Sequence, residues 1–253
     1  MNGYGIFSQF YDGLTFNVDY KKRADYIESI CARFSHHMGI TLDLACGTGS
    51  LTLLLKERGV DIYGIDGSPD MLSLANEKAY EKGLEILFLC QPMQRIDLYG
   101  TINTCICTLD SINHLTSKKE VQETFDRVSF FMDKDGLFVF DVNTVCKHRE
   151  ILGNNTFVYD TDQVFCVWQN SLKENNIVNI ELDLFEREGE SYYRRSERFS
   201  ERAYEIEELS SMLEKAGFSV EGIFADMTFD SLKENSDRAV LVARKKEQTN
   251  FEA

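Results

Sequence analysis

The feature that most constrains how this chain can fold is a regular alternation of short apolar segments with amphipathic ones, running from about residue 40 to residue 142. The apolar segments have the length and composition of buried strands, and the residues between them have helical spacing. The expected strands cover residues 40–44, 60–65, 85–90, 101–109 and 136–142. Strands separated by helices predict an α/β fold built on a doubly wound, mostly parallel sheet.

This rhythm changes between about Thr156 and Phe199, where β-rich segments and polar turns replace the helical pattern, which predicts an antiparallel insertion. After it, a helix that stops at Gly217 and two apolar runs bring the core sheet to seven strands. We expect five parts: an N-terminal lid and helix (1–37), a Rossmann-like cofactor-binding core (38–150), an antiparallel β insertion over the active site (151–203), the C-terminal part of the core (204–245) and a flexible tail (246–253).

Composition narrows the functional classes. The net charge of −15, from 42 acidic and 27 basic residues, disfavours nucleic acid as a partner. No apolar run approaches the roughly 18 residues of a membrane helix, and the first residues lack a signal-peptide pattern. The seven cysteines are scattered, with no CxxC pair, which favours reduced thiols and gives no indication of a metal site. We therefore expect a cytoplasmic protein, without a membrane or a metal, that could form a homodimer.

A glycine-rich turn, Asp43-Leu44-Ala45-Cys46-Gly47-Thr48-Gly49, follows the first expected strand. Glycine lacks a Cβ and tolerates positive φ, so such a turn lets the backbone approach a ligand. Asp66 ends the second strand, near the offset of roughly 20 residues at which a carboxylate meets the ribose of an adenosine cofactor. Leu109-Asp110-Ser111-Ile112-Asn113-His114 ends the fourth strand, which lies beside the first where the winding of such a sheet reverses. Together these segments predict an adenosine site.

Two adenosine cofactors compete for this turn. A nicotinamide dinucleotide needs a GxGxxG loop for its pyrophosphate, whereas this loop continues as Gly47-Thr48-Gly49-Ser50-Leu51-Thr52 without a third glycine. An anionic Asp43 would repel a pyrophosphate but suits the sulfonium and ammonium groups of S-adenosylmethionine. The remaining alternative is that the glycines only shape a strand–helix turn.

Four segments carry a family resemblance: Leu42–Gly49, Gly64–Leu72, Gln91–Met93 and Cys107–His114. With them, the chain resembles the class I S-adenosylmethionine-dependent methyltransferases, in particular bacterial members of the methyltransferase-domain family with a late β-rich insertion. The segments Phe7–Asp12 and Glu201–Tyr204 are also similar to that group, so the likeness covers most of the chain.

The resemblance implies a cofactor site with S-adenosylmethionine along the glycine loop, ribose hydroxyls on Asp66 and adenine against the ends of the second and third strands. Leu109 and Asp110 would lie under the methionine part, and Tyr11 would fold over the cofactor. Ala45 stands where many relatives have a third glycine, and Gln91 where many have an acid. The implied cofactor-binding residues are Tyr11, Asp43, Ala45, Cys46, Gly47, Thr48, Gly49, Asp66, Gly67, Ser68, Met71, Gln91, Met93, Leu109 and Asp110.

Methyl transfer is a direct displacement on an activated carbon, so the protein mainly aligns the two reactants and excludes water. A general base is needed only for a protonated acceptor, and the candidates are His114 and Asp110. His114 could equally be a structural hydrogen-bonding residue. The acceptor is expected to be a small molecule. The alternatives are a methyltransferase acting on RNA or protein and a non-catalytic regulatory protein that binds S-adenosylmethionine or S-adenosylhomocysteine.

The insertion is expected to select the acceptor, because it follows the fifth strand and so emerges at the ligand-binding edge. In an extended segment, Tyr193, Arg195 and Glu197 share one face, while Tyr192, Arg194, Ser196 and Arg198 share the other. Arginine pairs bidentately with carboxylates and tyrosine can stack, so Tyr193 and Arg195 suit a small carboxylate or planar acceptor. The alternative is a solvated strand whose charges only pair across the sheet.

Overall fold

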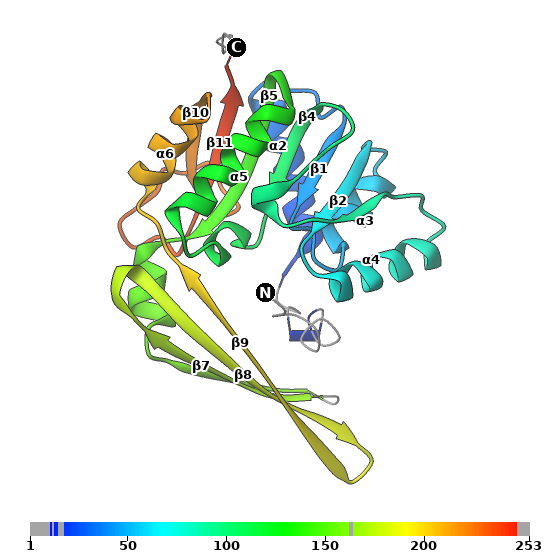
Figure 1. Cartoon of the computed structure of the whole chain (residues 1–253), viewed down its shortest axis with the longest axis vertical. Coiled ribbons are helices and arrows are strands. Elements are labelled where there is room, and N and C mark those ends of the chain that lie inside the picture. Colours follow the sequence, from blue (N-terminus) through cyan, green and yellow to red (C-terminus); the bar gives the residue numbers. More distant parts are fainter. Residues whose placement is uncertain (1–10, 12, 15–17, 162–163, 247–253) are drawn as a thin grey trace.

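The computed structural model describes residues 11, 13–14, 18–161 and 164–246. Its core is a seven-stranded sheet in the order β10-β11-β5-β4-β1-β2-β3 (Figure 1). Strands β1 to β5 are parallel, and β11 is antiparallel to both of its neighbours. The strands are β1 (Thr41–Leu44), β2 (Ile62–Asp66), β3 (Phe88–Cys90), β4 (Ile102–Cys107), β5 (Met132–Asn143), β10 (Phe218–Ala225) and β11 (Arg238–Lys245). The predicted doubly wound, mostly parallel sheet is confirmed, with β4 beside β1.

Helices cover both faces of this sheet. On one face α5 (Lys118–Phe131) and α6 (Ile206–Lys215) pack their apolar stripes against the strands, and on the other α2 (Tyr20–Arg33) and α3 (Ser50–Glu57) do so. Helix α4 (Pro69–Glu81) follows β2. It begins as its sequence predicts, because the Ser68 hydroxyl accepts a hydrogen bond from the Met71 amide and Pro69 occupies the first turn. A buried core therefore holds the carboxyl ends of β1, β2 and β4 at fixed positions.

Two strands begin three or more residues away from their expected start. The third strand is only Phe88–Cys90, because β3 is the edge strand and pairs with β2 alone. The fifth strand begins at Met132 and not at residue 136. Met132 has extended backbone angles and pairs with Ile102 of β4, so sheet pairing ends α5 at Phe131.

The insertion forms a second sheet, antiparallel and four-stranded, in the order β6-β7-β8-β9. Its strands are β6 (Thr156–Asp160), β7 (Val164–Leu172), β8 (Ile177–Glu188) and β9 (Ser191–Arg202). It extends from the end of the core where β5 finishes (Figure 1). One face carries the buried side chains Val178, Ile180, Leu182 and Leu184 of β8. We call this the inner face, because it packs in one cluster with Tyr11 and Met71.

Four short helical turns connect these elements. They are η1 (Met93–Arg95), η2 (Ser111–His114), η3 (Lys147–Leu152) and η4 (Glu174–Asn176). The predicted lid falls largely on residues 1–10, 12 and 15–17, and the predicted tail on residues 247–253, which lie outside the described residues. Within the part of the chain that is described, no helix has both the length and the apolar character needed to cross a bilayer.

Candidate active site

A hollow lies at the carboxyl ends of β1 and β4, as the topology of an open α/β sheet predicts. Seven of the predicted residues line it: Tyr11, Asp43, Ala45, Cys46, Gly47, Thr48 and Leu109. Tyr20, Leu51, Thr108 and Ser111 line it too, although the sequence analysis had not selected them. Thr108 and Ser111 belong to the quoted segment Cys107–His114, whereas Tyr20 comes from α2 and carries no local signal.

The glycine loop turns sharply because three of its residues have positive φ: Ala45 at 61°, Gly47 at 55° and Gly49 at 73°. Ala45 adopts this angle despite its Cβ, which explains why glycine suits the position. A Cβ on Gly49 would lie 2.9 Å from Leu53, so this glycine permits close helix packing. A Cβ on Gly47 would meet no protein atom within 4 Å, so Gly47 faces open space. The loop therefore presents bare backbone to the hollow.

The two acidic residues of this region have different surroundings. Asp66 accepts hydrogen bonds from the backbone amides of Gly47 at 2.9 Å and Ser68 at 2.8 Å, which fix its carboxylate between the loop and α4. Asp43 is only 2% exposed and accepts the Thr52 hydroxyl at 2.5 Å. Burial raises the pKa of Asp43 to about 7. Asp43 is therefore only partly ionised at neutral pH, so it attracts the sulfonium and ammonium groups of the cofactor less than the sequence analysis expected.

The residues expected around adenine lie at the ends of β2 and β3. Ser68 caps α4, Met71 is buried in the first turn of this helix, and Gly67, which precedes Ser68, is exposed. Gln91 uses its side chain within its own loop, donating to the Asp97 carbonyl at 3.1 Å and accepting the Asp97 amide at 2.8 Å. Met93 is half-buried against the main core cluster. The Gln91 side chain thus shapes the loop that borders this end of the site.

The turn after β4 is held in an unusual conformation by a buried carboxylate. Leu109 and Asp110 have φ of 58° and 54°, which costs a residue with a Cβ about 1–2 kcal/mol. Their amides donate to the two oxygens of Asp141 at 3.0 and 2.8 Å. Asp141 also accepts from Arg23 of α2 at 2.8 Å and from Arg238 of β11. Helix α2 and strand β11 thereby fix the shape of this turn.

The two candidate bases lie beside a third residue that the sequence analysis missed, Glu201 of β9. Ligand-type atoms of Asp110, His114 and Glu201 all lie within 4.8 Å of one another. Although burial opposes it, the pKa of Asp110 is lowered by Arg238, whose Nη2 donates to Asp110 at 2.6 Å. Burial lowers the pKa of His114, which keeps its imidazole neutral. Burial and the nearby Asp110 raise the pKa of Glu201.

Both candidate acceptor residues, Tyr193 and Arg195, lie on the inner face of the insertion, in line with Glu197, Phe199 and Glu201. Their side chains remain about half exposed, and Arg195 lies 3.5 Å from Glu186 of β8. The opposite face carries charge pairs, Arg194 with Asp183 and Arg198 with Glu181. The alternative of a solvated strand with cross-strand charge pairs therefore fits the outer face of β9.

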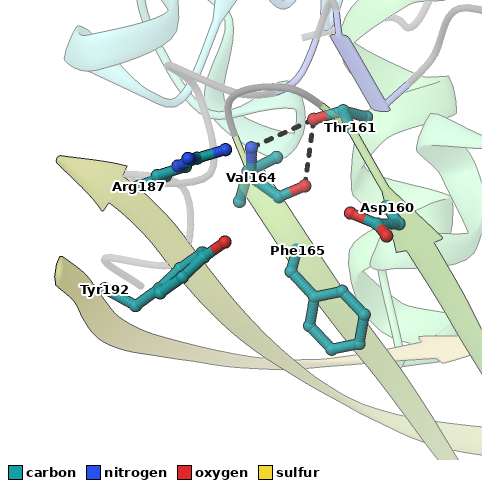
Figure 2. A pocket seen from close by; sticks show the side chains of 6 residues that line it. All are labelled: Asp160, Thr161, Val164, Phe165, Arg187 and Tyr192. Carbon is teal, nitrogen blue, oxygen red and sulfur yellow. Dashed lines mark hydrogen bonds between the residues drawn. The ribbon is translucent and has the colours of Figure 1, made fainter. Parts of the chain in front are cut away.

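A second hollow, of about 640 Å³, shares no lining residue with the first and lies at the hairpin ends of the insertion (Figure 2). Thr161 shapes one wall, since its hydroxyl accepts the Val164 amide at 3.0 Å and donates to the Val164 carbonyl at 2.9 Å. Arg187 and Tyr192 project from the other hairpin toward it. This hollow has no glycine loop and no strand end of the core sheet, so we place the candidate active site at β1 and β4.

Comparisons with known proteins agree with this location. Residues 41–136 match the family model for the methyltransferase domain. The putative methyltransferase YqeM of Bacillus subtilis (strain 168) is 32% identical, over 96% of this chain and 97% of its own. A crystal structure of an S-adenosylmethionine-dependent methyltransferase from Clostridium acetobutylicum superposes with a TM-score of 0.88 at 31% identity, covering 96% and 99% of the two chains.

A more distant solved structure shares the fold over nearly the whole chain. The sugar N-methyltransferase KedS8 from Streptoalloteichus has a TM-score of 0.80 at 18% identity, over 98% of this chain and 95% of its own. The bare loop at Gly47 and the fixed carboxylate of Asp66 fit an adenosyl cofactor in chemistry as well. The chain therefore belongs to the class I methyltransferases that use S-adenosylmethionine.

Proposed function

We propose that this methyltransferase acts on a small molecule, which binds between the carboxyl edge of the core sheet and the inner face of the insertion. The observation that carries the proposal is the course of β9. Its inner face runs from the exposed Tyr193 and Arg195 to the buried Glu201, which lies 3.7 Å from His114 beside the predicted cofactor site. A single strand can thus contact an acceptor along its length, and the sugar N-methyltransferase of similar fold acts on a small molecule.

On the cofactor side, we propose that Asp66 binds the ribose hydroxyls and that Gly47 lets the loop lie against the methionyl part. Tyr11 would cover the ligand, and Leu109 and Asp110 would support it from the β4 side. S-adenosylmethionine supplies a methyl group on a positively charged sulfur, which makes that carbon electrophilic. The chain's own contribution is to hold this carbon in line with the acceptor and to keep water out.

On the acceptor side, we assign the role of general base to His114, where one is needed. Asp110 is a weaker base because Arg238 lowers its pKa. The pKa of His114 is lowered by burial, so its neutral ring can accept a proton at neutral pH. Because methylation of a neutral amine creates an ammonium, His114 would take up the proton that this nitrogen releases. Tyr193 and Arg195 would orient the remainder of the acceptor.

We further propose that the protein works in the cytoplasm. All seven cysteines are free thiols, and four of them, Cys31, Cys105, Cys107 and Cys166, are buried. Free thiols persist in a reducing compartment, whereas secreted proteins of this cysteine content commonly form disulfides.

The test of the acceptor class is transfer of label from methyl-labelled S-adenosylmethionine into a cell extract separated into metabolite, protein and RNA fractions. We expect label in the metabolite fraction, and no transfer by a Gly47→Val variant run in parallel. Label in RNA or protein alone would contradict a small-molecule acceptor. Binding of S-adenosylhomocysteine without transfer to any fraction would favour the regulatory alternative.

A further inference from the structure

A cluster of four potential metal ligands lies between the core and the insertion, and the function proposed above uses only part of it. It is formed by Asp110 and His114 after β4, His148 of η3 and Glu201 of β9. We call these residues the His-carboxylate cluster. These three segments are distant from one another in sequence, so the cluster exists only when the insertion is seated on the core.

The spacing within the cluster is wider than hydrogen bonds allow. Glu201 lies between the two imidazoles, with Oε1 3.7 Å from Nε2 of His114 and Oε2 3.8 Å from Nε2 of His148. Nitrogen–oxygen hydrogen bonds are shorter, about 2.7–3.2 Å. Donors bound at about 2.0–2.2 Å to one ion, by contrast, lie roughly 3–3.6 Å from their neighbours. The ligand-type atoms of Asp110, His114 and Glu201 already lie within 4.8 Å of one another, so a small contraction around an ion would give these three residues that geometry. His148 is close to Glu201 and would move toward the other two residues to bind the same ion.

His148 provides an independent indication of a ligand. Its side chain is fully buried, and its Nε2 has no hydrogen-bond partner among the described residues. The other ring nitrogen, Nδ1, lies 3.0 Å from the carbonyl oxygen of Asn176, to which it can donate. That bond places the lone pair on Nε2, directed toward Glu201. A buried acceptor without a donor is costly, and a backbone carbonyl on the opposite nitrogen is the usual support of a metal-binding histidine.

The surrounding charges permit a cation here. Arg238 pairs with Oδ1 of Asp110 at 2.6 Å, as outer partners of metal ligands commonly do. Its own charge is already compensated by Asp141, with which it also pairs, and by Asp226 at 3.9 Å. Lys147 directs its amine to Asn143 at 2.8 Å. The carboxylate of Glu201 is 5% exposed, and a buried carboxylate is stabilised by pairing or by metal coordination.

We propose that Asp110, His114, His148 and Glu201 form a binding site for one divalent transition-metal ion, such as Zn²⁺, Co²⁺ or Mn²⁺. Two imidazoles with two carboxylates favour these ions over Mg²⁺ and Ca²⁺, which prefer oxygen ligands throughout. Scattered cysteines gave no indication of this site, because none of its ligands is a cysteine. An ion on Nε2 of His114 occupies the lone pair that a base uses, so the two states of His114 exclude each other.

The test is titration of the full-length, chelator-treated protein with Zn²⁺ and Co²⁺, followed by calorimetry and by the visible spectrum of bound cobalt. We expect one ion per chain and a cobalt spectrum without thiolate charge-transfer bands. Glu201→Gln and His148→Gln should each weaken binding by at least about 10- to 100-fold. His37→Gln and Glu57→Gln, which change the same residue types outside the cluster, should bind like the parent.

Binding of S-adenosylhomocysteine by each variant, measured without added metal, checks that the variant is folded. Absence of saturable binding by the parent protein would overturn the proposal without touching the methyltransferase assignment. So would equal binding by the cluster variants and the two controls, or a cobalt spectrum dominated by thiolate ligands. If His148→Gln fails to fold, the isosteric Glu201→Gln and the parent stoichiometry still decide the matter.

Discussion

The two sides of the active site are built in different ways. On the cofactor side, Asp66 is held by amides of Gly47 and Ser68, and Asp43 by Thr52, so every partner lies within 20 residues. On the acceptor side, Asp141 binds Arg23 and Arg238, which are 118 and 97 residues away, and Glu201 approaches two histidines from other segments. The cofactor side uses neutral donors that are close in sequence, whereas the acceptor side uses buried charges brought together by the fold.

Because of this difference, we expect substitutions on the cofactor side to disturb the rest of the fold less than substitutions on the acceptor side. A local turn is specified by a few consecutive residues, and its geometry survives changes elsewhere. A buried charge network depends on every element that contributes to it, so a change at one member is felt through the others. Substitutions on the two sides test this distinction.

Asp141→Ala should have the largest effect on stability. It leaves Arg23 and Arg238 without their shared carboxylate and removes the acceptor of two amides in a strained turn. Removing one partner of a buried pair costs about 3–5 kcal/mol of unfolding free energy. Denaturant unfolding measures it. Asp183→Ala, which breaks the surface pair with Arg194, should cost about 0–1 kcal/mol. Equal losses of unfolding free energy in the two variants would show that the acceptor-side network stabilises the fold no more than a surface ion pair does.

Gly47→Val should abolish cofactor binding while the protein stays folded. The new side chain points into open space where the ligand is proposed to lie, so affinity for S-adenosylhomocysteine should fall by more than about 100-fold, or ~2.7 kcal/mol. Gly59→Val is a matched control, since Gly59 also has positive φ and an open Cβ direction but lies after α3. Calorimetry on both variants separates backbone strain from ligand contact. Similar affinity in the two would place the cofactor elsewhere.

Asp66→Ala should weaken binding of S-adenosylhomocysteine by about 1.5–3 kcal/mol, the range for hydrogen bonds to a charged group. The effect is smaller than for Gly47→Val because the other contacts of the ligand remain. Asp70→Ala, an exposed acid in the first turn of α4, serves as the control and should bind like the parent. If both variants bind with unchanged affinity in calorimetry, Asp66 has no role at the ribose.

Arg195→Ala and Tyr193→Ala should each lower turnover by at least about tenfold, or ~1.4 kcal/mol of barrier, while cofactor affinity stays unchanged. The reason is that both side chains lie on the inner face, away from the glycine loop. Arg194→Ala changes the neighbouring residue on the outer face and should leave turnover intact. Turnover on the acceptor identified by labelling provides the measurement. No loss in either inner-face variant would make this part of β9 purely structural.

The smallest effect concerns pH. The pKa of Asp43 is raised to about 7 in the folded protein from an ordinary value of 3.8, so the unfolded chain binds fewer protons between these values. Stability from this group is therefore lost as pH rises from about 4 to 7. The Asp43→Asn variant lacks this titrating group. Its unfolding free energy relative to that of the parent should therefore rise between about pH 4 and pH 7. Denaturant unfolding at several pH values checks the sign. A constant difference would show that Asp43 does not titrate there.

The same contrast explains how far the sequence could predict this protein. The alternation of strands and helices, the glycine loop, the helix start at Ser68 and the antiparallel insertion follow from patterns a few residues long, and the structure has them. Glu201, His148 and Asp141 could not be selected as site residues, because no local pattern assigns them a role. Glu201 opens a segment that resembles the family, but the resemblance gave it no function. Their significance comes from contacts between β9, η3, β5 and the turn after β4. Burial of Asp43 likewise depends on packing that its local sequence does not reveal.

A crystal structure of the protein with S-adenosylhomocysteine tests the two-sided account most directly. We predict that the ribose hydroxyls lie within hydrogen-bonding distance of the Asp66 carboxylate. The sulfur, which carries the methyl group before transfer, should face the turn at Asp110 and the residues His114 and Glu201. A ribose bound away from Asp66, or a sulfur directed away from that cluster, would contradict the assignment of the cofactor and acceptor sides.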